Sequence, residues 1–157
     1  MQRRPLVLAI AAAGLAPALA RAHHGWSGFD QDRPLYLEGK ADSVVWKNPH
    51  AEVMLRVAPG LAVPADLARR AVPPQSTPVD AARILAAARV PARKDAVWEL
   101  ELAPLTRMEA WKVAEIKPGQ SLAVVGYTFP AEKGEAVLRV EYLFADGKVY
   151  GLRSSPA

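Results

Sequence analysis

The stretch VWELELAPLTRMEAWKVAEIKPGQSLAVVGY, residues 97–127, decides the fold. Apolar and polar residues alternate over 97–102, a pattern of period two that predicts a half-buried strand. Over 103–116 apolar residues recur at steps of three, which predicts a short helix. A Pro-Gly turn then leads into an apolar run at 121–129 that predicts the next strand. The stretch therefore predicts a strand, a short helix and a strand in succession.

Two more strands are predicted upstream of this stretch. Residues 35–46 alternate with period two, and Gly39 interrupts the pattern, which indicates a bend or bulge in a long strand. Residues 47–50 read KNPH, and Asn-Pro is typical of a turn. Alternation resumes over 51–58, so the two strands form a hairpin.

Two strands are also predicted downstream, and a long insertion lies between the second and third strands. The segments 136–145 and 148–153 alternate or are rich in β-formers, and Asp-Gly separates them. The Pro/Ala-rich insertion spans 59–95, where 78–90 predicts a helix with Ala82, Leu85, Ala86 and Val90 on one face. We expect the insertion to be mobile or loosely docked and not a separate domain.

The order of these elements predicts the fold class. A strand order with one short helix between the third and fourth strands is that of a small OB-like barrel of five to six strands, so the protein is predicted to be mainly β. An open sheet packed on one helix, or a simple meander, has the same order of elements. Closure of the sheet is what separates these alternatives.

The first 22 residues have the pattern of a secretory signal peptide. Arg3 and Arg4 precede an apolar run at 6–15, and small residues flank two cleavage points, after Ala20 and after Ala22. The run is short for a membrane span, so an anchor is the weaker alternative and no stable membrane span is predicted. We expect residues 23–157 to be a single domain that is periplasmic or secreted.

The charge of the processed chain excludes one class of partner. Removing Arg3, Arg4 and Arg21 with the signal lowers the 20 basic residues to 17, against 16 acidic ones. Because basic and acidic residues are nearly equal in number, we expect the chain to lack the basic surface of a nucleic-acid-binding protein. The chain has no cysteine, so neither disulfides nor thiolate metal ligands are available to it.

The three histidines, His23, His24 and His50, suggest a metal site. Cleavage after Ala22 would make His23 the first residue, whose α-amine and ring nitrogen can bind one metal together. His50, on the predicted turn, could supply a second imidazole, with His24 as a substitute or outer ligand. Ligation by nitrogen alone favours copper, Cu(II), over zinc and nickel.

Two further readings of the histidines remain open. Cleavage after Ala20 would place His23 third from a free amine, a spacing that also favours Cu(II) or Ni(II). Alternatively, the histidines near the cleavage point have no role, and His50 is an ordinary turn residue on the surface.

A binding module without metal is the main alternative function, for a small periplasmic ligand or a protein partner not identified by the sequence. The candidate contacts are weaker, and they are Trp26, Trp46, Asn48 and Trp98. An aromatic face of Tyr36, Trp98 and Tyr127 could stack sugars or bases. An enzyme ranks third, because Glu99 and Glu101 share one face of a strand and are expected to be simply its solvated side.

The segments AHHGWSGFD, LEGKADSVVWKNPHAEVMLRV, WELELAPLTRMEAWKVAEIKPGQSLAVVGY and DGKVY resemble a known family. This is an uncharacterised family of short exported bacterial proteins, domain of unknown function 6152, with His-His after the signal peptide. Its most specific motif is the Trp-x-Asn-Pro-His turn, here Trp46–His50. Departures include Gly25-Trp26 and Gln120, where the family more often has Ser-Phe and Asp. The resemblance implies an exported protein and a shared fold, and no established activity.

Overall fold

The computed structural model describes residues 25–157. Its strands, in chain order, are β1 (Leu35–Val45), β2 (Glu52–Val57), β3 (Val97–Glu101), β4 (Ser121–Tyr127), β5 (Val137–Ala145) and β6 (Lys148–Gly151). The α-helices are α1 (Ala81–Ala87) and α2 (Leu105–Ala110), and the 3-10 helices are η1 (Trp26–Gly28), η2 (Leu67–Arg69) and η3 (Pro130–Glu132). No helix within residues 25–157 has the length and apolar character needed to cross a membrane.

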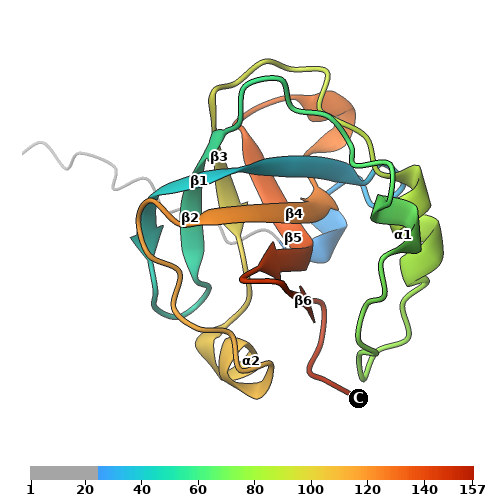
Figure 1. The fold of residues 1–157 in the computed structure, drawn as a ribbon, viewed down its shortest axis with the longest axis vertical. Coiled ribbons are helices and arrows are strands. Elements are labelled where there is room, and N and C mark those ends of the chain that lie inside the picture. The colour runs from blue at the N-terminus through green and yellow to red at the C-terminus, as the bar shows by residue number, and fades with distance from the viewer. Residues whose placement is uncertain (1–24) are drawn as a thin grey trace, which may run out of the picture.

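The sheet closes into a barrel. Its strand order is β3-β2-β1-β4-β5-β6, and β3 also pairs with β5 in parallel through Glu99↔Val137 and Glu101↔Arg139. Strands β1 to β5 therefore form a closed ring, with β6 added outside it on β5, and α2 lies between β3 and β4 at one end of the barrel (Figure 1). The predicted OB-like barrel is confirmed, and the open sheet is excluded.

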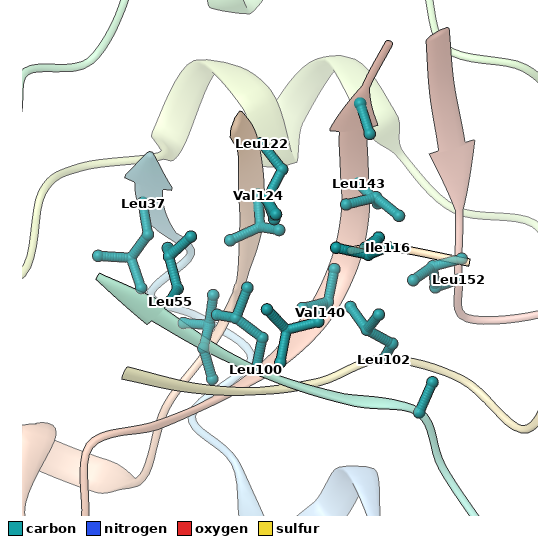
Figure 2. Close-up of a cluster of buried hydrophobic side chains, with 14 of the residues drawn as sticks. Leu37, Leu55, Leu100, Leu102, Ile116, Leu122, Val124, Val140, Leu143 and Leu152 are labelled. Atoms are coloured by element: carbon teal, nitrogen blue, oxygen red, sulfur yellow. The ribbon is translucent and has the colours of Figure 1, made fainter. Parts of the chain in front are cut away.

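The inward side chains of the five strands fill the barrel. Leu37, Leu55, Leu100, Val124 and Val140 are fully buried and converge on one another (Figure 2). They come from five different strands, because each strand presents every second residue to the interior. Burial of each such side chain stabilises the fold by about 1.5–3 kcal/mol.

Two irregularities bend the strands. Gly39 on β1 faces the backbone of β2 so closely that a Cβ would lie 2.0 Å from the Arg56 carbonyl oxygen, and the register also shifts between Ala41 and Ser43. The irregularity predicted near Gly39 is therefore real. On β5 the register shifts opposite Val125/Gly126, which leaves Glu141 between two paired residues.

The insertion is docked on the outside of the barrel, so the expectation of loose docking was wrong. Leu67 and Leu85 are 1% and 2% exposed and belong to a second apolar cluster with Tyr36, Val125 and Tyr142. These three residues point outward from β1, β4 and β5 and would otherwise face water. Their apolar surface explains why the insertion packs against the sheet.

Both α-helices are shorter than the sequence predicts. Helix α1 begins after Asp80, whose carboxylate accepts the Arg83 N–H at 3.0 Å, and it ends at Ala87, so Val90 is not part of it. Its buried residue is Leu85, whereas Ala82 and Ala86 are exposed. Helix α2 ends before Lys112, whose φ of 53° is incompatible with a continuing helix.

Candidate functional site

His50 lies where the first hairpin turn enters β2. The next residue, Ala51, is buried, and its backbone pairs with the chain after β3: its N–H donates to Ala103 at 3.1 Å and its carbonyl accepts from Leu102 at 2.9 Å. Strand alternation therefore places His50 on the same outer side as Glu52. His50 is half-buried there.

The turn that carries His50 is anchored to α2. The Asn48 side-chain oxygen accepts the backbone N–H of Leu105 at 3.1 Å, at the start of that helix. Trp46 is half-buried and packs against the barrel interior. Two residues that the sequence suggested as ligand contacts thus fix the position of the turn.

Trp26, the second of the described residues, is held by two arginines. The guanidinium carbons of Arg139 and Arg153 lie 5.1 Å and 4.1 Å from the centroid of the Trp26 ring, and Tyr127 meets the ring edge-on at 6.3 Å. Gln31 links the same parts, since its amide donates to the Trp26 carbonyl at 3.1 Å and accepts from Arg153 at 3.0 Å. These contacts fix the position of Trp26 on the barrel.

Two buried acids and two arginines form an ionic cluster beneath Trp26. Glu101, Arg139 and Glu141 are 7%, 5% and 0% exposed. Arg139 Nη1 lies 3.3 Å from Glu101 Oε2, and Arg153 Nη2 lies 2.6 Å from Glu141 Oε2. Burial lowers the pKa of Arg139 from its ordinary value, and Glu101 opposes that shift by its charge and its hydrogen bond. Each buried charge is thus compensated by an opposite one.

The cluster corrects the expectation that Glu99 and Glu101 form a solvated face. Glu99 is half-buried, and Glu101 is buried beneath the start of the chain and paired with Arg139. Arg139, Glu141 and Arg153 were not among the residues predicted from the sequence to form a site. The sequence does contain a signal for this cluster. The segment VLRVEYLFA, residues 137–145, is apolar except for Arg139 and Glu141, and charged residues are rarely buried in such a strand unless they are paired.

Strand register brings His50 and the start of the chain to one face. Glu52 is the partner of Glu101, and Glu101 is the partner of Arg139, so the three residues form one row across β2, β3 and β5. His50 lies two residues beyond the Glu52 end of this row, and Trp26 covers the Arg139 end. Two strand spacings separate the ends, roughly 10 Å.

The other predicted metal ligands, His23 and His24, lie outside the described residues. Within residues 25–157 no three or more histidine or acidic side chains come together as a group that could hold a metal.

The aromatic residues suggested as a stacking surface are buried instead. Tyr36, Trp98 and Tyr127 are each 1% exposed. Trp98 packs in the barrel interior, and the Arg93 guanidinium carbon lies 5.4 Å from its ring centroid. Trp98 also lines a pocket of about 360 Å³. A stacked sugar or base has no access to such a surface.

Comparison with known proteins gives one match, to the N-terminal third of the chain. Residues 10–62 match the family of unknown function DUF6152. The DUF6152 match covers both adjacent histidines, the Trp46–His50 turn and strands β1 and β2, and it ends at the start of the insertion. No curated protein and no solved structure matches the chain. The later segments that resemble the family lie outside the match.

Proposed function

We propose that the protein is an exported metal-binding module for Cu(II), in which a processed N-terminus and the loop histidine share one ion. The predicted signal peptide would be removed after Ala22 and the module would act in the periplasm. His23 would supply its α-amine and ring nitrogen, and His50 a second imidazole. His24 would be a substitute or outer ligand.

The observation that carries the proposal is the fixed position of Trp26. Its contacts with Arg139 and Arg153 hold the chain on the same face of the barrel as His50. Three residues of extended chain, from Trp26 back to His23, reach at most about 10 Å. The row that joins Arg139 to Glu52 is about as long, and His50 lies two residues, roughly 7 Å, along the chain from Glu52, so the ligand side chains must span the remainder.

The chemistry of the donors supports copper in particular. Two imidazoles and an amine give three nitrogen ligands, and Cu(II) is the divalent ion of the first row that such ligands bind most tightly. The amine and both imidazoles must lose a proton to bind, so affinity should fall as the pH drops below about 8, where the amine gains its proton, and more steeply below about 6.5.

The test begins with the mass of the mature protein, which identifies the cleavage point. Cu(II) is then titrated into wild type and into His50→Ala, with Lys47→Ala as a control in the same turn. Because it removes a direct ligand, His50→Ala should weaken binding by at least ~100-fold, more than loss of an outer partner usually costs. Lys47→Ala should leave the affinity unchanged.

A second variant tests the amino terminus. The double variant His23→Ala/His24→Ala removes both ring nitrogens next to the terminal amine and should abolish the tight site, with a loss of nitrogen couplings in the electron paramagnetic resonance spectrum of bound Cu(II). Equal affinity in wild type and His50→Ala would contradict the shared site. No binding by wild type would favour the module without metal.

A further inference from the structure

An open pocket of about 630 Å³ lies on the outer surface of the barrel, far from His50. It reaches the end of β2 at Arg56 and Val57, whereas His50 precedes the other end of that strand, roughly 20 Å away at the rise of a β-strand. The pocket therefore shares no residue with the proposed metal site. Its size is within the range of sites for small molecules.

The base of this pocket is one row of outward residues. Glu38 on β1 is the partner of Ala123, which is the partner of Phe144, which in turn is the partner of Val149 on β6. All four residues line the pocket. The walls are the chain that leaves β2, residues 57–59, and the turn between β5 and β6.

The neighbouring row shows why this one is open. Two residues along the same strands, Tyr36, Val125 and Tyr142 form a parallel row that the insertion covers with Leu67 and Leu85. The insertion (green, with α1 at the right in Figure 1) extends only to the edge of the pocket. There the Arg70 guanidinium carbon lies 5.3 Å from the ring centroid of Phe144.

The base of the pocket is apolar apart from Glu38, and its rim is mostly positive. Its lining includes four basic side chains and two acidic ones, namely Lys40, Arg56, Arg70, Lys148, Glu38 and Asp146. Arg56 is paired with Asp42 at 2.8 Å and Arg70 with Asp66 at 2.9 Å. Both acids of the lining accept a side-chain hydrogen bond: Glu38 from the Tyr36 hydroxyl, and Asp146 from the Gln120 amide.

The two lysines are the charges left for a ligand. Neither Lys40 nor Lys148 forms an ion pair with any residue in the range 25–157. Lys40 lies two residues after Glu38 and therefore on the same face of β1. Lys148 precedes Val149 on β6, next to the β5–β6 turn. Both lysines therefore stand on the same side of this row, toward the β5–β6 turn, but at its two ends on β1 and β6, three strand spacings or roughly 14 Å apart.

We propose that this pocket binds an amphipathic anion, a single-chain fatty carboxylate whose head lies between Lys40 and Lys148. Its chain would lie along Ala123 and Phe144 toward Arg70. The lining is mainly aliphatic, with Phe144 as its one aromatic ring, so it suits a flexible alkyl chain better than a stack of rings. The positive rim selects an anionic head over a cationic one.

The test uses laurate as the probe and displacement of the fluorescent anion 1-anilinonaphthalene-8-sulfonate as the readout. Wild type should bind laurate at least tenfold more tightly than dodecylammonium, which has the same chain and the opposite charge. The double variant Lys40→Glu/Lys148→Glu should bind laurate about tenfold more weakly, because each exposed charge contributes modestly. The matched control Lys112→Glu/Lys133→Glu changes the net charge equally on exposed sites outside the pocket and should bind as wild type does.

A steric variant locates the alkyl chain. Ser121 is exposed, lines the pocket and is the partner of Lys40, so Ser121→Trp fills the space without disturbing the interior and should abolish laurate binding. Ser43→Trp, an exposed site on β1 away from the pocket, should have no effect. Equal binding of laurate and dodecylammonium, unchanged binding by both pocket variants, or no binding of laurate by wild type would each overturn the proposal.

Discussion

Two segments cover the outside of the barrel, and they use different chemistry. The insertion covers Tyr36, Val125 and Tyr142 with apolar side chains. The 3-10 helix η1, at Trp26, covers charged residues and is held by arginines. Apolar contact is non-directional and mainly contributes stability, whereas a buried ionic cluster requires defined geometry and fixes position. The difference indicates that the insertion stabilises the barrel, whereas the ionic cluster fixes the position of Trp26.

The two covers meet at one residue. Glu141, displaced by the bulge in β5, accepts from Gln75 of the insertion at 3.3 Å and from Arg153 Nε at 2.8 Å. Gln75 also accepts from the Ser154 backbone at 3.0 Å, so the C-terminal segment lies between both covers. A bulge that buries a carboxylate thus joins three distant parts of the chain.

The largest effect on stability should come from removing one charge of the ionic cluster beneath Trp26. Arg139→Met leaves Glu101 buried without its arginine partner, and we expect a loss of about 3–5 kcal/mol in the free energy of unfolding. Urea denaturation followed by tryptophan fluorescence measures it. The double variant Arg139→Met/Glu101→Leu removes both charges and should recover most of the stability. A double variant as unstable as the single one would show that packing, and not charge, holds this cover in place.

A smaller loss is expected when the apolar cover is weakened. Leu85→Ala removes a side chain that is 2% exposed and should lower the free energy of unfolding by about 2–4 kcal/mol. Arg83→Ala, an exposed position of the same helix, is the control and should change stability by less than about 0.5 kcal/mol. Binding of Cu(II) should be the same in Leu85→Ala as in wild type. A loss of copper affinity would contradict the division of roles between the covers.

The smallest effect concerns the buried tyrosines, whose ionisation changes the stability of the fold only at alkaline pH. All four tyrosines of the chain have a raised pKa, chiefly because they are buried, and that of Tyr142 is raised to about 12. In the unfolded chain they ionise near pH ~10. Because the folded pKa is the higher one, their contribution to stability is complete below pH ~10 and is lost as the pH rises toward 12.

Tyrosinate absorbance and near-ultraviolet circular dichroism, recorded together against pH, check this. Ionisation of Tyr36 and Tyr142, under the insertion, and of Tyr127, beside Trp26, should coincide with loss of tertiary structure. Leu85→Ala should shift the transition to lower pH, because it weakens the cover over the first two. A tyrosine that ionises near pH ~10 in the folded protein would identify a cover that opens without unfolding.

The barrel could be predicted from sequence because its signals are local. Period-two alternation over 97–102 and 51–58, and the helix between two strands, each depend on neighbouring residues. The insertion could not be placed in this way, because Leu67 and Leu85 are explained only by Tyr36, Val125 and Tyr142, which lie on three strands far away in sequence. Helix ends were also overestimated, since the α2 pattern continues beyond Lys112, where the backbone turns.

The candidate site was harder to predict for the same reason. His50 could be assigned to a turn, and Asn48 and Trp46 to its surroundings, from the KNPH segment alone. The burial of Glu101 could not, because its partner Arg139 comes from a strand that pairs with β3 only when the barrel closes. Glu101, which the local pattern predicts to be solvated, is therefore buried by long-range strand pairing, and it pairs with the arginine that contacts Trp26.

The insertion leaves and rejoins the barrel at neighbouring points. The Val57 N–H donates to the Ala96 carbonyl at 2.9 Å, and Arg56 is the partner of Val97. A segment spliced between these positions leaves both strands where they are, and loop closure becomes only slightly more costly as the segment lengthens. This junction is therefore a natural point for relatives to diverge in length, and for an engineer to exchange the segment, provided that the replacement shields the tyrosines beneath it.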